Sequence, residues 1–209
     1  MNALAAALAA HRLGADARAI SAGLAAVSAS EMRFVRQAID GIEVVNDAYN
    51  ANPESMRASI RAFAESSSAA QRRVVVLGDM LELGDAAESL HRELGEWLPE
   101  AIAGGPPELA IFVGPLSAAA SRAFARAAPE SESLHLPDAG AASAEALRAV
   151  LRAGDSVLFK ASRGVALERL IAALAAPGAG AGAGAVAGAR SSAESETRAG
   201  PRPRAGGSR

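Results

Sequence analysis

Short apolar runs alternate with helical stretches along most of this 209-residue sequence, and this alternation limits the fold more than any other feature. β-branched residues are frequent in runs such as residues 42–45, 74–77 and 109–113, and helical composition follows each run. Strands that alternate with helices in this way form mostly parallel sheets with helices on both faces. The sequence therefore predicts an α/β fold, a Rossmann-like, mostly parallel sheet flanked by helices.

The expected elements follow from the same pattern. The expected strands cover residues 34–38, 42–45, 74–77, 109–113, 134–136 and 156–160. The expected helices cover residues 1–13, 16–24, 54–65, 86–98, 116–127, 142–152 and 164–175. The first two strands join at Asp40-Gly41, a dipeptide typical of hairpin turns.

Composition excludes several classes of function. A formal net charge of -2 with no basic block before the tail argues against nucleic acid as the main partner. Zero cysteines exclude a disulfide scaffold and fit a reducing cytoplasm, where we expect the protein to act. No segment approaches the ~20 apolar residues of a membrane span. The apolar run at residues 2–10 lacks a charged leader, so we expect no signal peptide.

A polar, asparagine-rich segment follows the second expected strand and carries the strongest functional signal. Asp47, Tyr49, Asn50 and Asn52 come directly after the strand, and Pro53 stands where a helix can begin. Ligands bind at the carboxyl ends of strands in open α/β sheets. A carboxylate there can accept both hydroxyls of a ribose, or it can cap a turn. The amides can read a peptide or an adenine edge, or they can close the loop in Asx turns.

Charged residues also follow the third expected strand. Asp79 and Glu82 could hold a cationic amino group or cap the next helix. His91 lies on that helix, where a lone histidine is more often structural than catalytic.

The last expected strand ends in a second polar segment. Lys160, Ser162 and Arg163 lie at the end of this strand and at the expected start of a helix. Two cations, a hydroxyl and free helix N–H groups suit a carboxylate or a phosphate, although a solvated helix start is the alternative.

Three segments together resemble the C-terminal domain of the Mur ligases, in the type that adds D-alanyl-D-alanine to UDP-N-acetylmuramoyl-tripeptide. They are NDAYNANPESM at residues 46–56, LGDMLELG at residues 77–84 with His91 following, and KASRG at residues 160–164. The first two are highly specific to that type. The third departs from it, because the family usually has glycine where this chain has Ala161. The resemblance covers roughly the first five-sixths of the chain.

The resemblance implies roles for individual residues. It implies that Asp47 binds the ATP ribose, that Arg33 contacts the nucleotide, and that Asn2 contacts the adenine. A guanidinium can stack on adenine or reach phosphate oxygens, but a solvated arginine is the alternative at this position. We expect the remaining candidates to bind the peptide substrates, with the last segment facing the incoming dipeptide and its carboxylate. These candidates are Tyr49, Asn50, Asn52, Lys160, Ser162 and Arg163.

No phosphate-binding loop of the form G-x-x-x-x-G-K-[ST] occurs in the sequence. In the Mur family this loop, the magnesium ligands and a modified lysine belong to a central domain, which would hold most of the ATP and Mg²⁺. We expect residues 1–30 to be a helical remnant of that domain, residues 31–176 to be the Mur ligase C-terminal domain, and residues 177–209 to be a disordered low-complexity tail. We therefore expect this chain to contribute no catalytic residue or metal ligand and to be inactive alone.

The expected partners are UDP-muramoyl tripeptide and D-alanyl-D-alanine, together with the other ligase domains, which a separate chain could supply. Two alternatives remain open. One is a stand-alone module that binds nucleotide or dipeptide without chemistry. The other is a different ligase of the wider superfamily, similar to folylpolyglutamate synthase, against which Met80, Glu82 and Leu83 argue.

The composition of residues 177–209 leads to a first testable prediction. Gly-Ala repeats followed by Ser, Glu, Arg and Pro cannot bury enough apolar area to offset their ordering entropy. Deleting all residues after Ala176 should change the free energy of unfolding by less than about 0.5 kcal/mol, measured by thermal or urea denaturation. A clearly lower stability of the shortened chain would mean that the tail packs on the domain.

Overall fold

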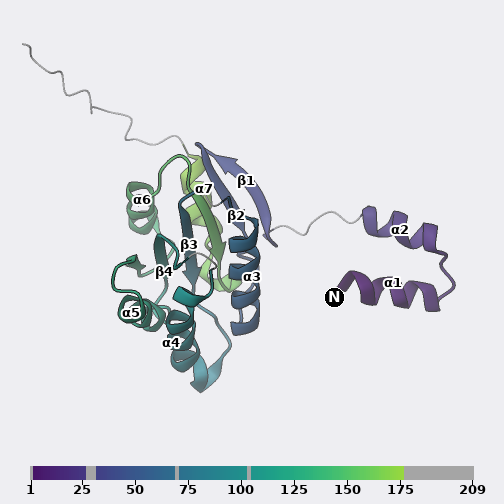
Figure 1. The fold of residues 1–209 in the computed structure, drawn as a ribbon, viewed down its shortest axis with the longest axis horizontal. Coiled ribbons are helices and arrows are strands. Elements are labelled where there is room, and N and C mark those ends of the chain that lie inside the picture. The colour runs from purple at the N-terminus through teal and green to yellow at the C-terminus, as the bar shows by residue number, and fades with distance from the viewer. Residues whose placement is uncertain (1, 27–31, 69–70, 103–104, 177–209) are drawn as a thin grey trace, which may run out of the picture. The chain divides into compact units, whose positions relative to one another are not determined.

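The computed structural model describes residues 2–26, 32–68, 71–102 and 105–176, and the expected disordered tail lies outside them. A six-stranded sheet has the order β1-β2-β6-β3-β4-β5 (Figure 1). Its strands are β1 (Val35–Ile39), β2 (Ile42–Asn46), β3 (Arg73–Gly78), β4 (Leu109–Val113), β5 (Glu132–Leu136) and β6 (Ser156–Lys160). β1 pairs with β2 antiparallel and all other neighbours pair parallel, which confirms the expected mostly parallel α/β sheet.

Seven α-helices lie in the described part of the chain. They are α1 (Asn2–Arg12), α2 (Ala17–Ala25), α3 (Pro53–Ser66), α4 (Ala87–Trp97), α5 (Ala118–Ala127), α6 (Ala141–Val150) and α7 (Glu168–Ala175). Asp16 caps α2, because its Oδ1 accepts the N–H of Ala19 at 2.7 Å. The two N-terminal helices are thus present, as expected.

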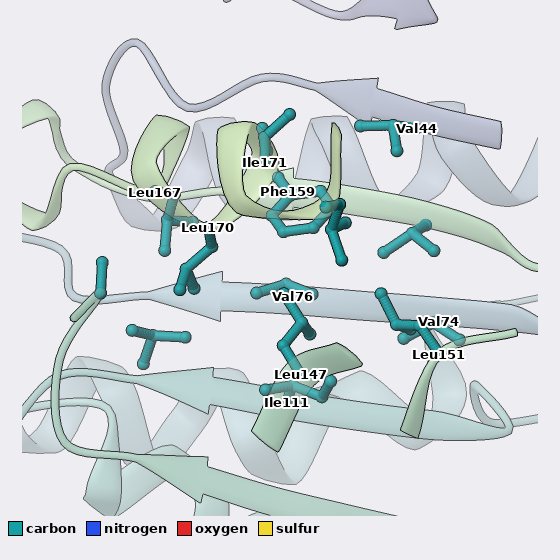
Figure 2. Packing of buried hydrophobic residues seen from close by; sticks show 14 of the residues in the cluster. Val44, Val74, Val76, Ile111, Leu147, Leu151, Phe159, Leu167, Leu170 and Ile171 are labelled. Atoms are coloured by element: carbon teal, nitrogen blue, oxygen red, sulfur yellow. The ribbon is translucent and has the colours of Figure 1, made fainter. Parts of the chain in front are cut away.

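The sheet separates two apolar cores, because successive side chains of a strand point to opposite faces. On β3, Val74 and Val76 enter one core, whereas Val75 and Leu77 enter the other. The first core is closed by α6 and α7, whose Leu147 and Leu170 pack over the sheet (Figure 2). The second core is closed by α3, α4 and α5. Helices therefore cover both faces.

The sequence explains why α3 begins where it does. Asn52 and Ser55 form a reciprocal capping box, and Pro53 occupies the first turn, where no partner for its nitrogen is needed. Met56, Ile60 and Phe63 are spaced for one helix face, and all three are fully buried in the second core. The start of α3 thereby fixes the end of the loop that follows β2.

The predicted hairpin between the first two strands is confirmed. Asp40 and Gly41 both have positive φ, 48° and 79°, as a two-residue hairpin turn requires. β1 forms one edge of the sheet and is mostly exposed, and Arg36 on β1 pairs with Glu43 on β2. A charged edge strand of this kind discourages pairing with other chains.

Three expected helix boundaries were wrong. The helix expected from residue 116 begins at Ala118, because residues 114–117 form a turn held by the Asp79 carboxylate. The helix expected to end at residue 152 ends at Val150, because Leu151 is extended. The helix expected from residue 164 begins at Glu168, as described with the site below.

The contact between α4 and α5 leads to a prediction about stability. A Cβ atom added at the buried Gly95 would lie 2.2 Å from the Ala120 carbonyl oxygen, so the two helices approach closely only because position 95 lacks a side chain. Gly95→Ala should lower the free energy of unfolding by about 1–3 kcal/mol in urea denaturation, although alanine favours helix. The matched control is Glu93→Ala on the exposed side of α4, which should change it by less than about 0.5 kcal/mol. Equal effects of the two changes would contradict this packing.

Candidate functional site

The candidate site lies where three neighbouring parallel strands end. β2, β6 and β3 are adjacent in the sheet, and Lys160 at the end of β6 is in register with Leu77 on β3. The loops that leave these strands carry the polar segments singled out in the sequence. The topology thus brings together segments that are far apart along the chain, at the sheet edge where parallel α/β proteins bind ligands.

A buried ion pair joins the ends of β2 and β6. Lys160 Nζ lies 2.7 Å from Asp47 Oδ2 and also donates to the carbonyl oxygen of Asn50 at 3.1 Å. The other carboxylate oxygen of Asp47 accepts the N–H of Phe34 at 3.1 Å. The Lys160 side chain is 3% exposed and that of Asp47 is 17% exposed. The pair therefore fixes the loop after β2 and leaves one side of the carboxylate open to solvent.

Ser162 and Asn52 also hold loops together. Ser162 Oγ accepts the N–H of Leu81 at 2.9 Å and donates to the carbonyl oxygen of Ala51 at 3.2 Å, so one buried hydroxyl links the loops after β3, β6 and β2. Asn52 caps α3 through its side chain. These two predicted substrate residues are thus engaged within the protein.

Asp79 and His91 are buried and structural. The Asp79 carboxylate accepts the N–H groups of Leu116 and Ser117, at 3.3 and 2.7 Å, and so holds the loop after β4. One of the two alternatives for Asp79, a cap on the next helix, is therefore wrong. His91 Nε2 accepts the N–H of Met80 at 3.0 Å, and its Nδ1 contacts the Ala87 carbonyl oxygen at 2.6 Å.

The segment after β6 is not the start of an α-helix. Arg163–Val165 form a single 3₁₀ turn, in which the N–H groups of Val165 and Ala166 bond to the carbonyl oxygens of Ser162 and Arg163. Ala166 then adopts a left-handed conformation with φ of 60°, and α7 begins only at Glu168. The expectation that a helix begins here and offers its free N–H groups to an anion is therefore wrong. The exposed Arg163 guanidinium remains.

Three other predicted residues are exposed beside these loops. The Arg33 guanidinium lies over the Tyr49 ring, 4.3 Å from its centroid, in a cation–π contact. Tyr49 is 45% exposed, and Asn50 is exposed as well. Asn50 Oδ1 accepts the N–H of Ala51 at 2.9 Å, which leaves the amide nitrogen to donate elsewhere. Asn2 opens α1, and its side chain lies outside what the structure describes.

Two clefts flank Tyr49 and Asn50. The first has a volume of about 750 Å³ and is lined by Met32, Tyr49, Asn50, Leu81, Glu82, Ser162, Arg163 and Gly164. The second has a volume of about 500 Å³ and is lined by Arg33, Phe34, Asp47, Tyr49, Asn50, Asn52, Ser55, Ala58, Ser59, Ala62 and Lys160. Both volumes lie in the range of small-molecule sites. The loop after β2 thus lines two adjacent clefts.

Sequence reasoning missed two features of these clefts. Ser59, on the second turn of α3, lines the second cleft, and its buried Oγ has no hydrogen-bond partner among the described residues. Met32 and Leu81 supply apolar wall to the first cleft. A serine inside a helical run and apolar residues in loops are common in any sequence, so nothing in the sequence marked these three residues as part of a cleft.

The amino ends of the parallel strands, on the other side of the sheet from the clefts, also gather charges, but these charges pair within the protein. Arg72 Nη1 lies 3.2 Å from the buried Asp155 Oδ2, and Arg73 pairs with Glu108 at 3.3 Å. Burial raises the pKa of Glu108, but its hydrogen bonds from backbone N–H groups and from Arg73 outweigh burial, so the net pKa is lowered. The amino ends of the strands are therefore a weaker candidate for a ligand site.

No described helix is long and apolar enough to cross a membrane. Within the same described ranges, no group of three or more His, Cys, Asp or Glu side chains is arranged to hold a metal ion.

The chain is similar to known proteins in both sequence and structure. It matches the family described as Mur ligase, glutamate ligase domain, over residues 32–163. The UDP-N-acetylmuramoyl-tripeptide–D-alanyl-D-alanine ligase of Bacillus subtilis (strain 168) is 34% identical over 176 residues, which cover 82% of this chain and 36% of that protein. The protein of the same name from Mycobacterium tuberculosis (strain ATCC 25618 / H37Rv) is 36% identical over 191 residues, covering 84% and 37%.

Solved structures agree with this relationship. The MurF ligase from Thermotoga maritima in complex with ADP has a TM-score of 0.61 at 27% identity, over 80% of this chain and 35% of that one. MurF from Acinetobacter baumannii has a TM-score of 0.67 at 29% identity, over 83% and 36%. The chain thus spans little more than a third of the length of the relatives that it matches.

The ion pair yields a prediction that can be measured on the chain itself. Lys160→Met leaves the Asp47 carboxylate unpaired in a mostly buried place, which should lower the free energy of unfolding by roughly 2–3 kcal/mol. Because Asp47 is partly exposed and can rehydrate, we expect less than the full cost of an orphaned buried charge. Urea denaturation measures the change.

A double-mutant cycle separates the pair from its surroundings. The variant with both Lys160→Met and Asp47→Asn should be more stable than the sum of the single losses allows, by about 1 kcal/mol or more. Arg92→Met, which removes an exposed cation from α4, is the control and should cost less than about 0.5 kcal/mol. Strict additivity of the two changes would contradict a coupled pair.

Proposed function

Because this chain belongs to the Mur ligase family through its glutamate ligase domain, we propose that it forms the C-terminal part of a D-alanyl-D-alanine-adding ligase of peptidoglycan synthesis. One observation carries the proposal: two clefts share Tyr49 and Asn50 at the strand ends, in a chain related to such ligases over most of its length. A ligase that joins two substrates at the expense of ATP needs adjacent surfaces of this kind. The rest of the enzyme would either precede this chain or be supplied by a separate chain, with residues 1–30 belonging to its ATP-binding domain.

The second cleft suits the sugar side of a nucleotide. The solvent-exposed side of the Asp47 carboxylate can accept a ribose hydroxyl, because two oxygens offer about four acceptor positions and the structure uses two of them. The buried Ser59 hydroxyl offers a second polar group in the same cleft. Arg33, stacked on Tyr49, stands at its border, where a guanidinium can reach phosphate oxygens. Asn2 would contact the adenine from the preceding domain.

The first cleft would receive the dipeptide. Tyr49, Asn50 and Arg163 present exposed polar groups to it, so we assign them direct contacts with peptide. Lys160, Ser162 and Asn52 contribute to substrate binding by holding the loops that carry these groups, since each is engaged in the hydrogen bonds described above.

ATP, with Mg²⁺, would supply the phosphoryl group that activates the carboxylate of the UDP-muramoyl tripeptide. The residues of this chain would close over the activated group, exclude water that would hydrolyse it, and hold the amine of the dipeptide near it. Because the sequence contains no phosphate-binding loop, the chain should not catalyse ligation alone.

A domain exchange tests the proposal. The part of the Bacillus subtilis ligase that matches this chain is replaced by this chain, and formation of UDP-muramoyl pentapeptide and ADP is measured. We expect the exchanged enzyme to form product only with D-alanyl-D-alanine, and this chain alone to form none. A folded exchange enzyme without dipeptide-dependent ADP release would overturn the proposal, as would turnover by the isolated chain.

The exchange enzyme also tests the role of Asp47. Asp47→Asn should raise the KM for ATP by about tenfold to a hundredfold, because a charge-assisted hydrogen bond contributes roughly 1.5–3 kcal/mol. The KM for D-alanyl-D-alanine should change much less. Glu145→Gln, an exposed change on α6, is the control. An equal rise in both KM values would mean that Asp47 acts by shaping the whole site.

A further inference from the structure

Two charges of opposite sign line the first cleft. Glu82 stands on the loop after β3, and Arg163 stands on the loop after the neighbouring β6. Both side chains are exposed. Arg163 Nη1 contacts the sulfur of Met32 at 3.1 Å, and Glu82 has no hydrogen bond or ion pair with any described residue. Each charge is thus available to a ligand.

The backbone fixes Glu82 in this place. Its φ of 63° lies in the left-handed region, which is uncommon and costly for a residue with a side chain. The preceding residue, Leu81, is held to the loop after β6, because its N–H donates to Ser162 Oγ. Leu81 also packs so closely on Gly164 that a Cβ there would lie 2.8 Å from its Cδ1. These contacts of Leu81 hold the neighbouring Glu82 beside the same cleft as Arg163.

We propose that Glu82 binds the ammonium group of the incoming D-alanyl-D-alanine while Arg163 binds its carboxylate, so that the cleft recognises the free dipeptide by both charged ends. This inference rests on the proposed function, and it adds Glu82 as a specificity residue. A dipeptide spans only about 7 Å, which a cleft of about 750 Å³ accommodates with room for the second substrate. Met32 and Leu81 would contact its methyl groups.

The chemistry assigns Glu82 to recognition. A carboxylate attracts the protonated amine, which is the main form of a free amino terminus near neutral pH. The amine must lose a proton before it attacks, so Glu82 positions the substrate and selects against peptides whose amino end is blocked. Such a blocked peptide leaves Glu82 unpaired and cannot act as a nucleophile.

Ligand and protein variants together test this assignment. The 209-residue chain is titrated in ¹⁵N NMR with D-alanyl-D-alanine, its N-acetyl form and its C-terminal amide. We expect the free dipeptide to bind about tenfold more tightly than either blocked form. Glu82→Gln should remove the preference over the N-acetyl form only, and Arg163→Gln the preference over the amide only. Glu145→Gln should remove neither.

A second variant separates recognition from folding. Glu82→Gly suits the left-handed backbone, so it should raise the melting temperature while it weakens binding of the free dipeptide. A purely structural role would make stability and binding change in the same direction.

Three results of the titration would overturn the inference. The first is equal binding of the free and N-acetyl dipeptides by the unchanged chain, and the second is equal weakening of both by Glu82→Gln. The third is that no NMR chemical shift of a cleft residue changes at the highest soluble dipeptide concentration. The proposed function is judged separately, by product formation in the exchange enzyme. An active exchange enzyme in which Glu82→Gln leaves the KM for D-alanyl-D-alanine unchanged would remove this assignment and keep the ligase.

Discussion

The buried ion pair between Lys160 and Asp47 is the interaction on which the arrangement of this site depends. Taking two charges out of water costs several kcal/mol for each ion, and only good geometry and further hydrogen bonds offset this cost. Here Lys160, the only lysine of the sequence, also donates to the Asn50 carbonyl oxygen, and Asp47 also accepts from Phe34. The pair ties β2 to β6 on one side, and the partly exposed carboxylate faces the second cleft on the other. A single contact thus joins the stability of neighbouring strand ends to the placement of a carboxylate at the second cleft.

The sheet was predictable from the sequence because its central strands are apolar on both faces and are separated by helical stretches. The meeting of the candidate segments was predictable for the same reason, since parallel strands have their carboxyl ends on one side of the sheet. The ion pair between Asp47 and Lys160 was not predictable. Asp47 and Lys160 are separated by 113 positions, and each residue type is as suitable for a ligand as for a partner within the fold. Spacing along the chain carries no information on which of the two applies.

The polar residues selected from sequence divide by whether their side chains are engaged within the protein. Asn52, Asp79, His91 and Ser162 all use their side chains to hold loops, whereas Arg33, Tyr49 and Arg163 are exposed beside the clefts. Tyr49 and Arg163 depend on the engaged residues, because Asn52 and Ser162 fix the loops that carry them. The mistaken helix start after β6 has the same origin. Its residues have helical composition, but the hydrogen bonds of Ser162 to two neighbouring loops and the left-handed Ala166 delay the helix to Glu168.

The departure from the family pattern at Ala161 fits this arrangement. Ala161 is fully buried, and a Cβ atom placed on Gly78 would lie only 2.7 Å from the Cβ of Ala161. The absence of a side chain on Gly78 therefore provides the space that the extra methyl group of Ala161 needs. With that space available, the ends of β3 and β6 remain close enough for the Ser162 N–H to bond to the Asp79 carbonyl oxygen at 3.0 Å. The contact that sets Leu81 and Glu82 beside Arg163 is thereby kept, although one of the residues usual in the family is not.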